Sequence, residues 1–156
     1  MFLGAAFCYA PWGLRAQVGL PPDAPLMTAA QAQEWRQLRL LKGHFEGGPW
    51  NEAIDRWQGR KHQLMLALAA DLLSRSARTD EVLKKLGRPD AQLLPRHPAY
   101  KNAASQLTSV SPAGPLTGTT GAPTFWLYHW RGHHDQLVFS VSQGRVSATG
   151  WLHTFE

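Results

Sequence analysis

The sequence predicts an α+β domain in which two to three helices pack on a three-stranded antiparallel β-meander. Between residues 28 and 86, apolar residues recur at spacings of three and four, as in amphipathic helices. Residues 124–153 instead form aromatic or alternating segments separated by glycine-containing turns, as in strands. The chain has 156 residues, of which 44% are hydrophobic and 17% charged. This size and composition suit one domain that folds without disulfide or metal staples.

Residues 1–27 are predicted to be a weakly ordered or signal-like N-terminus, followed by a single domain over residues 28–156. The first 14 residues are apolar and uncharged, too short to span a bilayer but long enough for the apolar part of an export signal. No basic residues precede them, as they would in an export signal. A lipoprotein cleavage box requires a small residue immediately before the cysteine, but Phe7 precedes Cys8. Three hypotheses stay open: a clipped export signal, a loosely docked terminus, and a lipid anchor on Cys8.

Three helices are expected in the first half of the domain. Thr28 is suited to cap a helix over residues 28–42, which Gly43 would end. Asn51 is suited to cap a long helix over residues 51–74. A short helix over residues 80–86 would be ended by Gly87 and Pro89.

The long helix carries an apolar stripe that is expected to face the core. Lys61 is the only residue that interrupts this stripe, and Trp57 is predicted to be a core residue because it lies on it. The members of the stripe are Ile54, Trp57, Lys61, Met65, Leu68 and Leu72.

Residues 91–123 are predicted to form a long irregular loop. Proline, glycine, serine, threonine and alanine dominate this stretch, and no period is sustained. A loop of this length inside a compact domain is either a tolerated surface insertion, the simpler interpretation, or a functional segment.

Three strands are expected over residues 124–131, 136–142 and 146–153, joined by turns at residues 132–135 and 143–145. Side chains alternate between the two sides of a strand. Phe125, Leu127 and His129 should therefore point to one face of the sheet, and Trp126, Tyr128 and Trp130 to the other. One of the two faces must cover the helices.

The sequence lacks the common signatures of catalysis and cofactor binding. It has no Gly-x-Ser-x-Gly nucleophile motif and no glycine-rich phosphate loop with a Lys-Ser/Thr ending. The net charge of +5 is spread without any run of five like charges, so nucleic-acid binding is not expected. His129, His133, His134 and Asp135 cluster around one hairpin, but adjacent histidines point apart in an extended chain, so a solvated hairpin tip is favoured over a metal site.

Aromatic residues near the C-terminus are the candidates for partner binding. Seven tryptophans are present, and aromatic side chains beside arginine are typical of binding hot spots. The alternative is that the same face covers the helices and belongs to the core. The predicted partner-binding residues are Trp126, Tyr128, Trp130, Arg131 and Trp151.

The order of elements and several motifs resemble the BamE-like (SmpA/OmlA) domain superfamily. Residues 82–90, VLKKLGRPD, look like its V-x-x-x-L-G-x-P-[DT] signature. The aromatic strand at residues 128–131, LVF at 137–139 and GRV at 144–146 resemble its later strands and turn. The resemblance covers residues 50–153. It departs from the family where Ser76, Ala77 and Arg78 replace the usual Gly-Met-[ST], and in the length of the 91–123 loop.

The resemblance implies a non-catalytic binding or scaffold protein of the bacterial envelope, periplasmic or membrane-associated. It would recognise a protein partner through the aromatic sheet face, with no metal and no small-molecule cofactor. Two alternatives remain. One is a metal-dependent enzyme that uses the hairpin histidines, and the other is a cytosolic immunity-type inhibitor if the N-terminus is retained.

Overall fold

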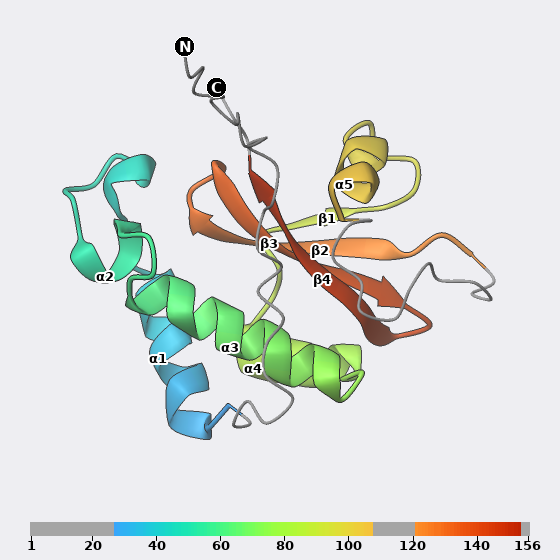
Figure 1. Ribbon diagram of the computed structural model, residues 1–156, viewed down its shortest axis with the longest axis horizontal. Coiled ribbons are helices and arrows are strands. Elements are labelled where there is room, and N and C mark those ends of the chain that lie inside the picture. The colour runs from blue at the N-terminus through green and yellow to red at the C-terminus, as the bar shows by residue number, and fades with distance from the viewer. Residues whose placement is uncertain (1–26, 108–120, 154–156) are drawn as a thin grey trace, which may run out of the picture.

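The computed structural model describes residues 27–107 and 121–153, and it has the expected α+β class. Its sheet contains four antiparallel strands in the order β1-β2-β3-β4, so each strand pairs with its neighbour in the chain. Helices α1, α3 and α4 lie on one side of the sheet, and α5 lies on the other (Figure 1). The strands are β1 (Ala91–Leu93), β2 (Thr124–Arg131), β3 (Asp135–Ser142) and β4 (Arg145–His153).

Helix α1 (Ala29–Arg39) begins as the sequence predicts. Thr28 accepts a hydrogen bond from the Gln31 backbone N–H, and the Gln31 side chain accepts one from the Thr28 backbone, which completes a capping box. Trp35 is the anchor of this helix, since it is fully buried and its indole N–H donates to the Leu86 carbonyl at 3.2 Å. A short 3-10 helix, η1 (His44–Glu46), follows.

The predicted long helix over residues 51–74 is wrong in one respect, because it is divided into α2 (Glu52–Asp55) and α3 (Arg60–Ser74). Asn51 caps α2 as expected. The break follows from backbone geometry: Gln58 has a φ of 60°, and a Cβ on Gly59 would lie 2.6 Å from the Glu52 carbonyl oxygen. The chain therefore turns tightly between the two helices. Apolar residues before and after the turn no longer follow one continuous helical stripe.

Because of this turn, the prediction that Trp57 is a core residue is wrong. The side chain lies in the turn between α2 and α3 and is 56% exposed, so it is not a core residue. Lys61, which interrupts the stripe, is instead 2% exposed. Burial lowers the pKa of its ammonium group, and the charges of Glu46, Asp90 and Asp55 oppose that change.

Helix α4 (Thr79–Leu86) ends at Gly87, as the sequence predicts. Gly87 has a φ of 80°, a conformation that favours glycine, and its carbonyl accepts a hydrogen bond from the Tyr128 hydroxyl at 3.0 Å. Glycine at this position thus ends the helix and brings a carbonyl to the sheet.

The prediction of one irregular loop over residues 91–123 is wrong for its first half. β1 pairs with β2 in the register Ala91 to Leu127, and α5 (Tyr100–Leu107) packs on the second face of the sheet. Tyr100 stacks on Phe125 with ring centroids 4.7 Å apart. Both elements are short, so their apolar residues show no clear period in the sequence. These residues are buried only because β1 and α5 pack on the rest of the sheet.

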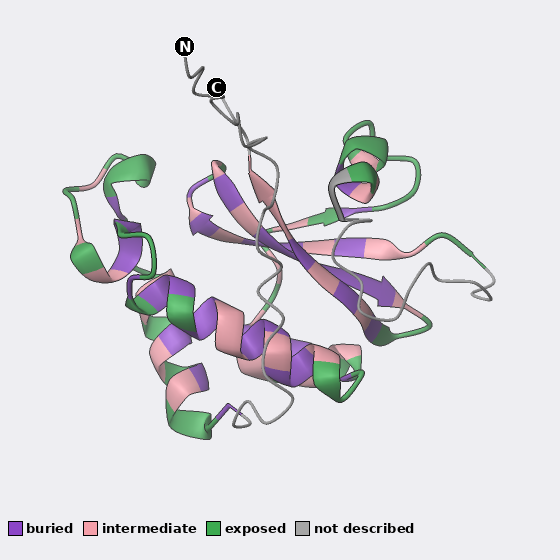
Figure 2. Ribbon diagram, viewed as in Figure 1, coloured by how far each residue is buried: buried purple, intermediate pink, exposed green. Residues whose placement is uncertain are grey.

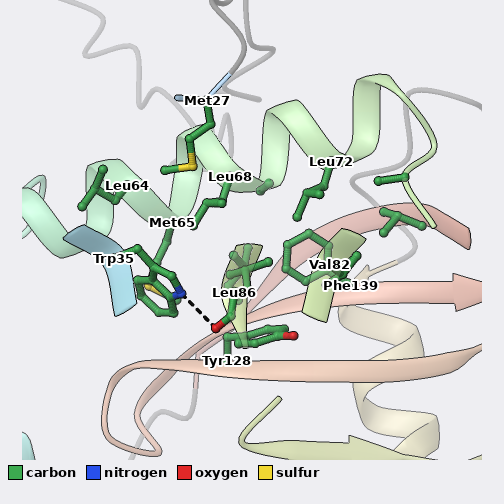
Figure 3. Packing of buried hydrophobic residues seen from close by; sticks show 14 of the residues in the cluster. Met27, Trp35, Leu64, Met65, Leu68, Leu72, Val82, Leu86, Tyr128 and Phe139 are labelled. Carbon is green, nitrogen blue, oxygen red and sulfur yellow. Dashed lines mark hydrogen bonds between the residues drawn. The ribbon is translucent and has the colours of Figure 1, made fainter. Parts of the chain in front are cut away.

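The predicted alternation along β2 is confirmed. Phe125 and Leu127 face α5, whereas Tyr128 and Trp130 face α1, α3 and α4. Figure 2 shows buried residues along the strands and along one side of α3. In Figure 3, Leu68, Leu72, Val82, Leu86, Tyr128 and Phe139 fill the space between α3 and the sheet.

The predicted N-terminal segment lies outside the described residues, apart from Met27, which is 5% exposed and packs in the core (Figure 3). Residues 108–120 of the predicted loop also lie outside them. Among the described helices, none combines the length and the apolar character needed to cross a bilayer.

Candidate functional site: an aromatic surface around a buried histidine

Four aromatic rings from three parts of the chain meet near the turn between β2 and β3. We call Trp57, His62, Trp130 and Trp151 the tryptophan–histidine cluster. The centroid of the His62 ring lies 4.2 Å from that of Trp130 and 4.7 Å from that of Trp57, so the imidazole packs against both indoles. Trp151 on β4 lies 5.1 Å from His62 and 5.8 Å from Trp130. The cluster joins the start of α3 to two strands of the sheet.

His62 is an unusual member of this cluster because it is polar, 3% exposed and incompletely hydrogen-bonded. Its Nδ1 is the only buried side-chain nitrogen or oxygen without a hydrogen-bond partner in the part of the chain that the structure describes. Burial lowers its pKa from 6.5 to about 4, and the positive charge of Arg131 acts in the same direction, while Asp135 opposes it. The ring is therefore neutral at pH 7.

A second set of polar side chains borders the cluster. Arg131 donates from Nε to Asp135 Oδ2 at 2.7 Å, and His153 Nδ1 lies 2.5 Å from Asp135 Oδ1. The Arg131 guanidinium also lies over the Trp130 ring at 4.2 Å and over the Phe45 ring at 5.0 Å. Asp135 thus holds a cation against the aromatic rings at the end of the sheet.

Three large aromatic side chains are exposed around this end of the molecule. Phe45 is 38%, Trp50 53% and Trp57 56% exposed. Ring contacts connect Trp50 to His44 at 6.4 Å and Phe45 to His134 at 5.5 Å, while Trp57 lies 5.5 Å from Trp130. We call Phe45, Trp50 and Trp57 the aromatic surface.

Buried Asp55 holds the segment that carries this surface. Its carboxylate accepts hydrogen bonds from the backbone N–H groups of His44, at 3.0 and 3.1 Å, and of Asn51, at 2.8 Å. Gly43 packs so closely on the same carboxylate that a Cβ there would lie 2.2 Å from Oδ1. The indole N–H of Trp130 also donates to the Ile54 carbonyl at 2.8 Å. The exposed rings therefore project from a segment that is hydrogen-bonded to the domain.

An open depression lies beside Trp57. Its lining is mainly polar and comes from the end of α2, the turn and the first part of α3. The lining residues are Glu52, Ala53, Arg56, Trp57, Gln58, Gly59 and Gln63. An exposed indole beside amide and charged groups offers both apolar contact and hydrogen bonds to a partner.

The five predicted binding residues are divided by the structure. Trp130, Arg131 and Trp151 meet at the cluster, but Tyr128 and Trp126 do not join them. The prediction that Tyr128 and Trp130 offer a surface to a partner is wrong, because each is 0% exposed. The face that carries them covers the helices, which was the alternative interpretation. Trp126, also on that face, is half-buried against the core, as is Trp151.

Sequence reasoning missed the aromatic surface and His62. Phe45 and Trp50 lie in a segment rich in glycine and proline, where no long helix or strand is expected to bury a large aromatic side chain. Large aromatic residues in such a segment could therefore have indicated an exposed surface. His62 gave none, because its neighbours Trp130 and Trp151 are distant in the chain.

The hairpin histidines do not gather around one point. The His129 and His133 rings lie 4.5 Å apart at an interplanar angle of 67°, while His134 packs against Phe45. Within residues 27–107 and 121–153, no three histidine, cysteine, aspartate or glutamate side chains are grouped as metal ligands. The metal-dependent alternative has no observation in its favour there.

Comparison with known proteins identifies no relative. No protein-family model, no curated protein and no solved structure matches the chain.

Proposed function

We propose that this protein is a non-catalytic binding or scaffold protein of the bacterial envelope that recognises a protein partner. The resemblance of its motifs to BamE-like domains supports the class and the location. The aromatic surface, Phe45, Trp50 and Trp57, with the adjoining Arg131 and the partly exposed Trp151, is the contact region that the geometry favours.

One observation carries this proposal: three large aromatic side chains are exposed together on a segment that is held in place by buried groups. Exposed apolar surface that is grouped in one region marks interaction sites, and tryptophan and arginine dominate the energetics of interfaces. Asp55 and Trp130 already hold the segment in place. Binding of a partner would therefore cost little conformational entropy in this segment.

The aromatic surface is tested by site-specific photo-crosslinking in cell extract. A benzophenone amino acid replaces Trp57 in one variant and Leu94 in a control variant. Leu94 is 54% exposed, so the two probes are equally accessible. We expect a discrete crosslinked protein from position 57 and none from position 94.

A second experiment tests the energetic contribution of the rings. Trp50→Ala/Trp57→Ala should lose the partner that wild type captures in a pull-down, while Leu94→Ala should retain it. Circular dichroism would establish that each variant is folded. Equal capture by the wild type and the double variant would contradict the proposal, as would identical crosslinks from positions 57 and 94.

A further inference from the structure

Helices α1 and α4 form a second surface that combines exposed leucines with cations. Leu40 is 83% exposed at the end of α1, and Leu83 on α4 is 41% exposed. The two helices adjoin at this surface, because Arg36 Nη1 donates to the Lys84 carbonyl at 2.8 Å. Leu40 lies one helical turn beyond Arg36, on the same side of α1.

The surface continues past the end of α1. Leu41 is 49% exposed, and Lys42 is exposed beside it. We call Arg36, Leu40, Leu41, Lys42, Leu83 and Lys84 the leucine–cation face. It is formed by other residues than the aromatic surface defined above.

The charge of this face is positive and is not neutralised by the described part of the chain. Arg36, Lys42 and Lys84 form no ion pair with any described carboxylate. The acidic side chains of the neighbouring helices are already paired. Glu34 binds Arg60 and Asp90 binds Arg39, while Asp80 on α4 binds Arg78.

We propose that the leucine–cation face binds the surface of an anionic lipid bilayer. Exposed leucines can enter the boundary between head groups and acyl chains, while lysine and arginine remain at the level of the phosphates. Each cation gains from the negative surface potential of such a bilayer. A lipid surface is favoured over an acidic protein because exposed leucines flanked by lysine and arginine are typical of elements that lie on membranes.

This inference does not depend on the proposed protein partner, since the two surfaces share no residue. A protein bound at Phe45, Trp50 and Trp57 would simply be held near the membrane. Failure of either proposal therefore leaves the other unaffected.

The test is co-flotation of the full chain with lipid vesicles. One set of vesicles contains phosphatidylcholine alone, and the other an equal mixture of phosphatidylcholine and phosphatidylglycerol. We expect wild type to float with the mixed vesicles and to remain in solution with the neutral ones. Raising the salt concentration should release it, because salt screens the attraction.

Three variants locate the contact. Arg36→Glu/Lys84→Glu should weaken binding to the mixed vesicles by about 10-fold or more, since it reverses two charges on the face. Leu40→Ser keeps the net charge and should weaken binding about threefold or more by removing apolar contact. The matched control, Arg96→Glu/Lys101→Glu, makes the same change in net charge at exposed residues in and before α5, and should bind almost as wild type does.

The outcomes separate the proposal from general charge attraction. Circular dichroism first establishes that each variant is folded. If the control double variant loses as much binding as Arg36→Glu/Lys84→Glu, net charge alone explains the effect and the proposed face is wrong. Absence of wild-type binding to the mixed vesicles at low salt would overturn the proposal outright.

Discussion

The buried imidazole of His62 should make the protein less stable in mild acid. In the folded protein its pKa is lowered from 6.5 to about 4, so the ring stays neutral where the unfolded chain would bind a proton. The contribution of His62 to stability is therefore fully present above pH 6.5 and is lost as the pH falls toward 4. Below pH 4 both states are protonated, and the loss stops.

The size of the effect follows from these two pKa values. The difference between a pKa of 6.5 and one of about 4 corresponds to a total of about 3 kcal/mol. Most of it falls within the range that solution measurements reach. Between about pH 7.5 and about pH 4.5, the free energy of unfolding should decrease by about 2 to 3 kcal/mol through this group alone.

The comparison that isolates this effect is between wild type and His62→Phe. Phenylalanine keeps a planar ring against Trp57 and Trp130 but removes the buried nitrogen without a partner. Other acid-sensitive groups are common to both proteins, so their effects cancel in the difference. Urea unfolding followed by tryptophan fluorescence, at a series of pH values, gives the free energy of unfolding of each protein.

We expect the free energy of unfolding of His62→Phe to gain about 2 to 3 kcal/mol on that of wild type as the pH falls from about 7.5 to about 4.5. A His97→Gln variant, which changes an exposed histidine, should instead follow the wild-type curve. If the wild-type and His62→Phe curves run parallel over this range, the buried ring is not held neutral and the argument fails.

Three further substitutions test the packing that supports the site. Lys61→Met should raise the free energy of unfolding by about 1 to 3 kcal/mol in chemical denaturation, because it removes a buried ammonium group that has no ion pair among the described residues; a lower value would contradict this. Trp130→Ala should cost about 3 to 5 kcal/mol in the same assay, since it leaves a cavity beside His62; a cost below about 1 kcal/mol would show that the cluster does not support the fold. Gly87→Ala should lower the melting temperature by about 2 to 4 °C, because alanine is strained at a φ of 80°. An unchanged value would mean that the backbone relaxes there.

Much of the fold could be predicted because the signals are local. Thr28, Asn51 and Gly87 each act within one helical turn, and all three cap helices in the structure. The strands over residues 124–153 follow from aromatic and β-branched residues between glycine turns. The division of side chains between the two faces of β2 follows from the period of a strand, independent of what covers each face.

The candidate site depended on contacts between distant parts of the chain. Trp57 has the spacing of a core residue, and only the turn at Gln58 and Gly59 directs it outward. His62 meets Trp130 and Trp151 because α3 packs on the face of the sheet with its first turn beside these two residues, an arrangement that no local pattern encodes.

The sequence alone thus determined the class of the fold, the caps of its helices and the alternation along its strands, since these depend on neighbours within a few residues. Tertiary structure decided which face of the sheet is covered by α1, α3 and α4 and which by α5. With that face buried under α1, α3 and α4, Tyr128 and Trp130 became core residues. The exposed aromatic residues are instead found on the segment that Asp55 holds, because burial is set by the whole packed domain and not by the side chain's own character.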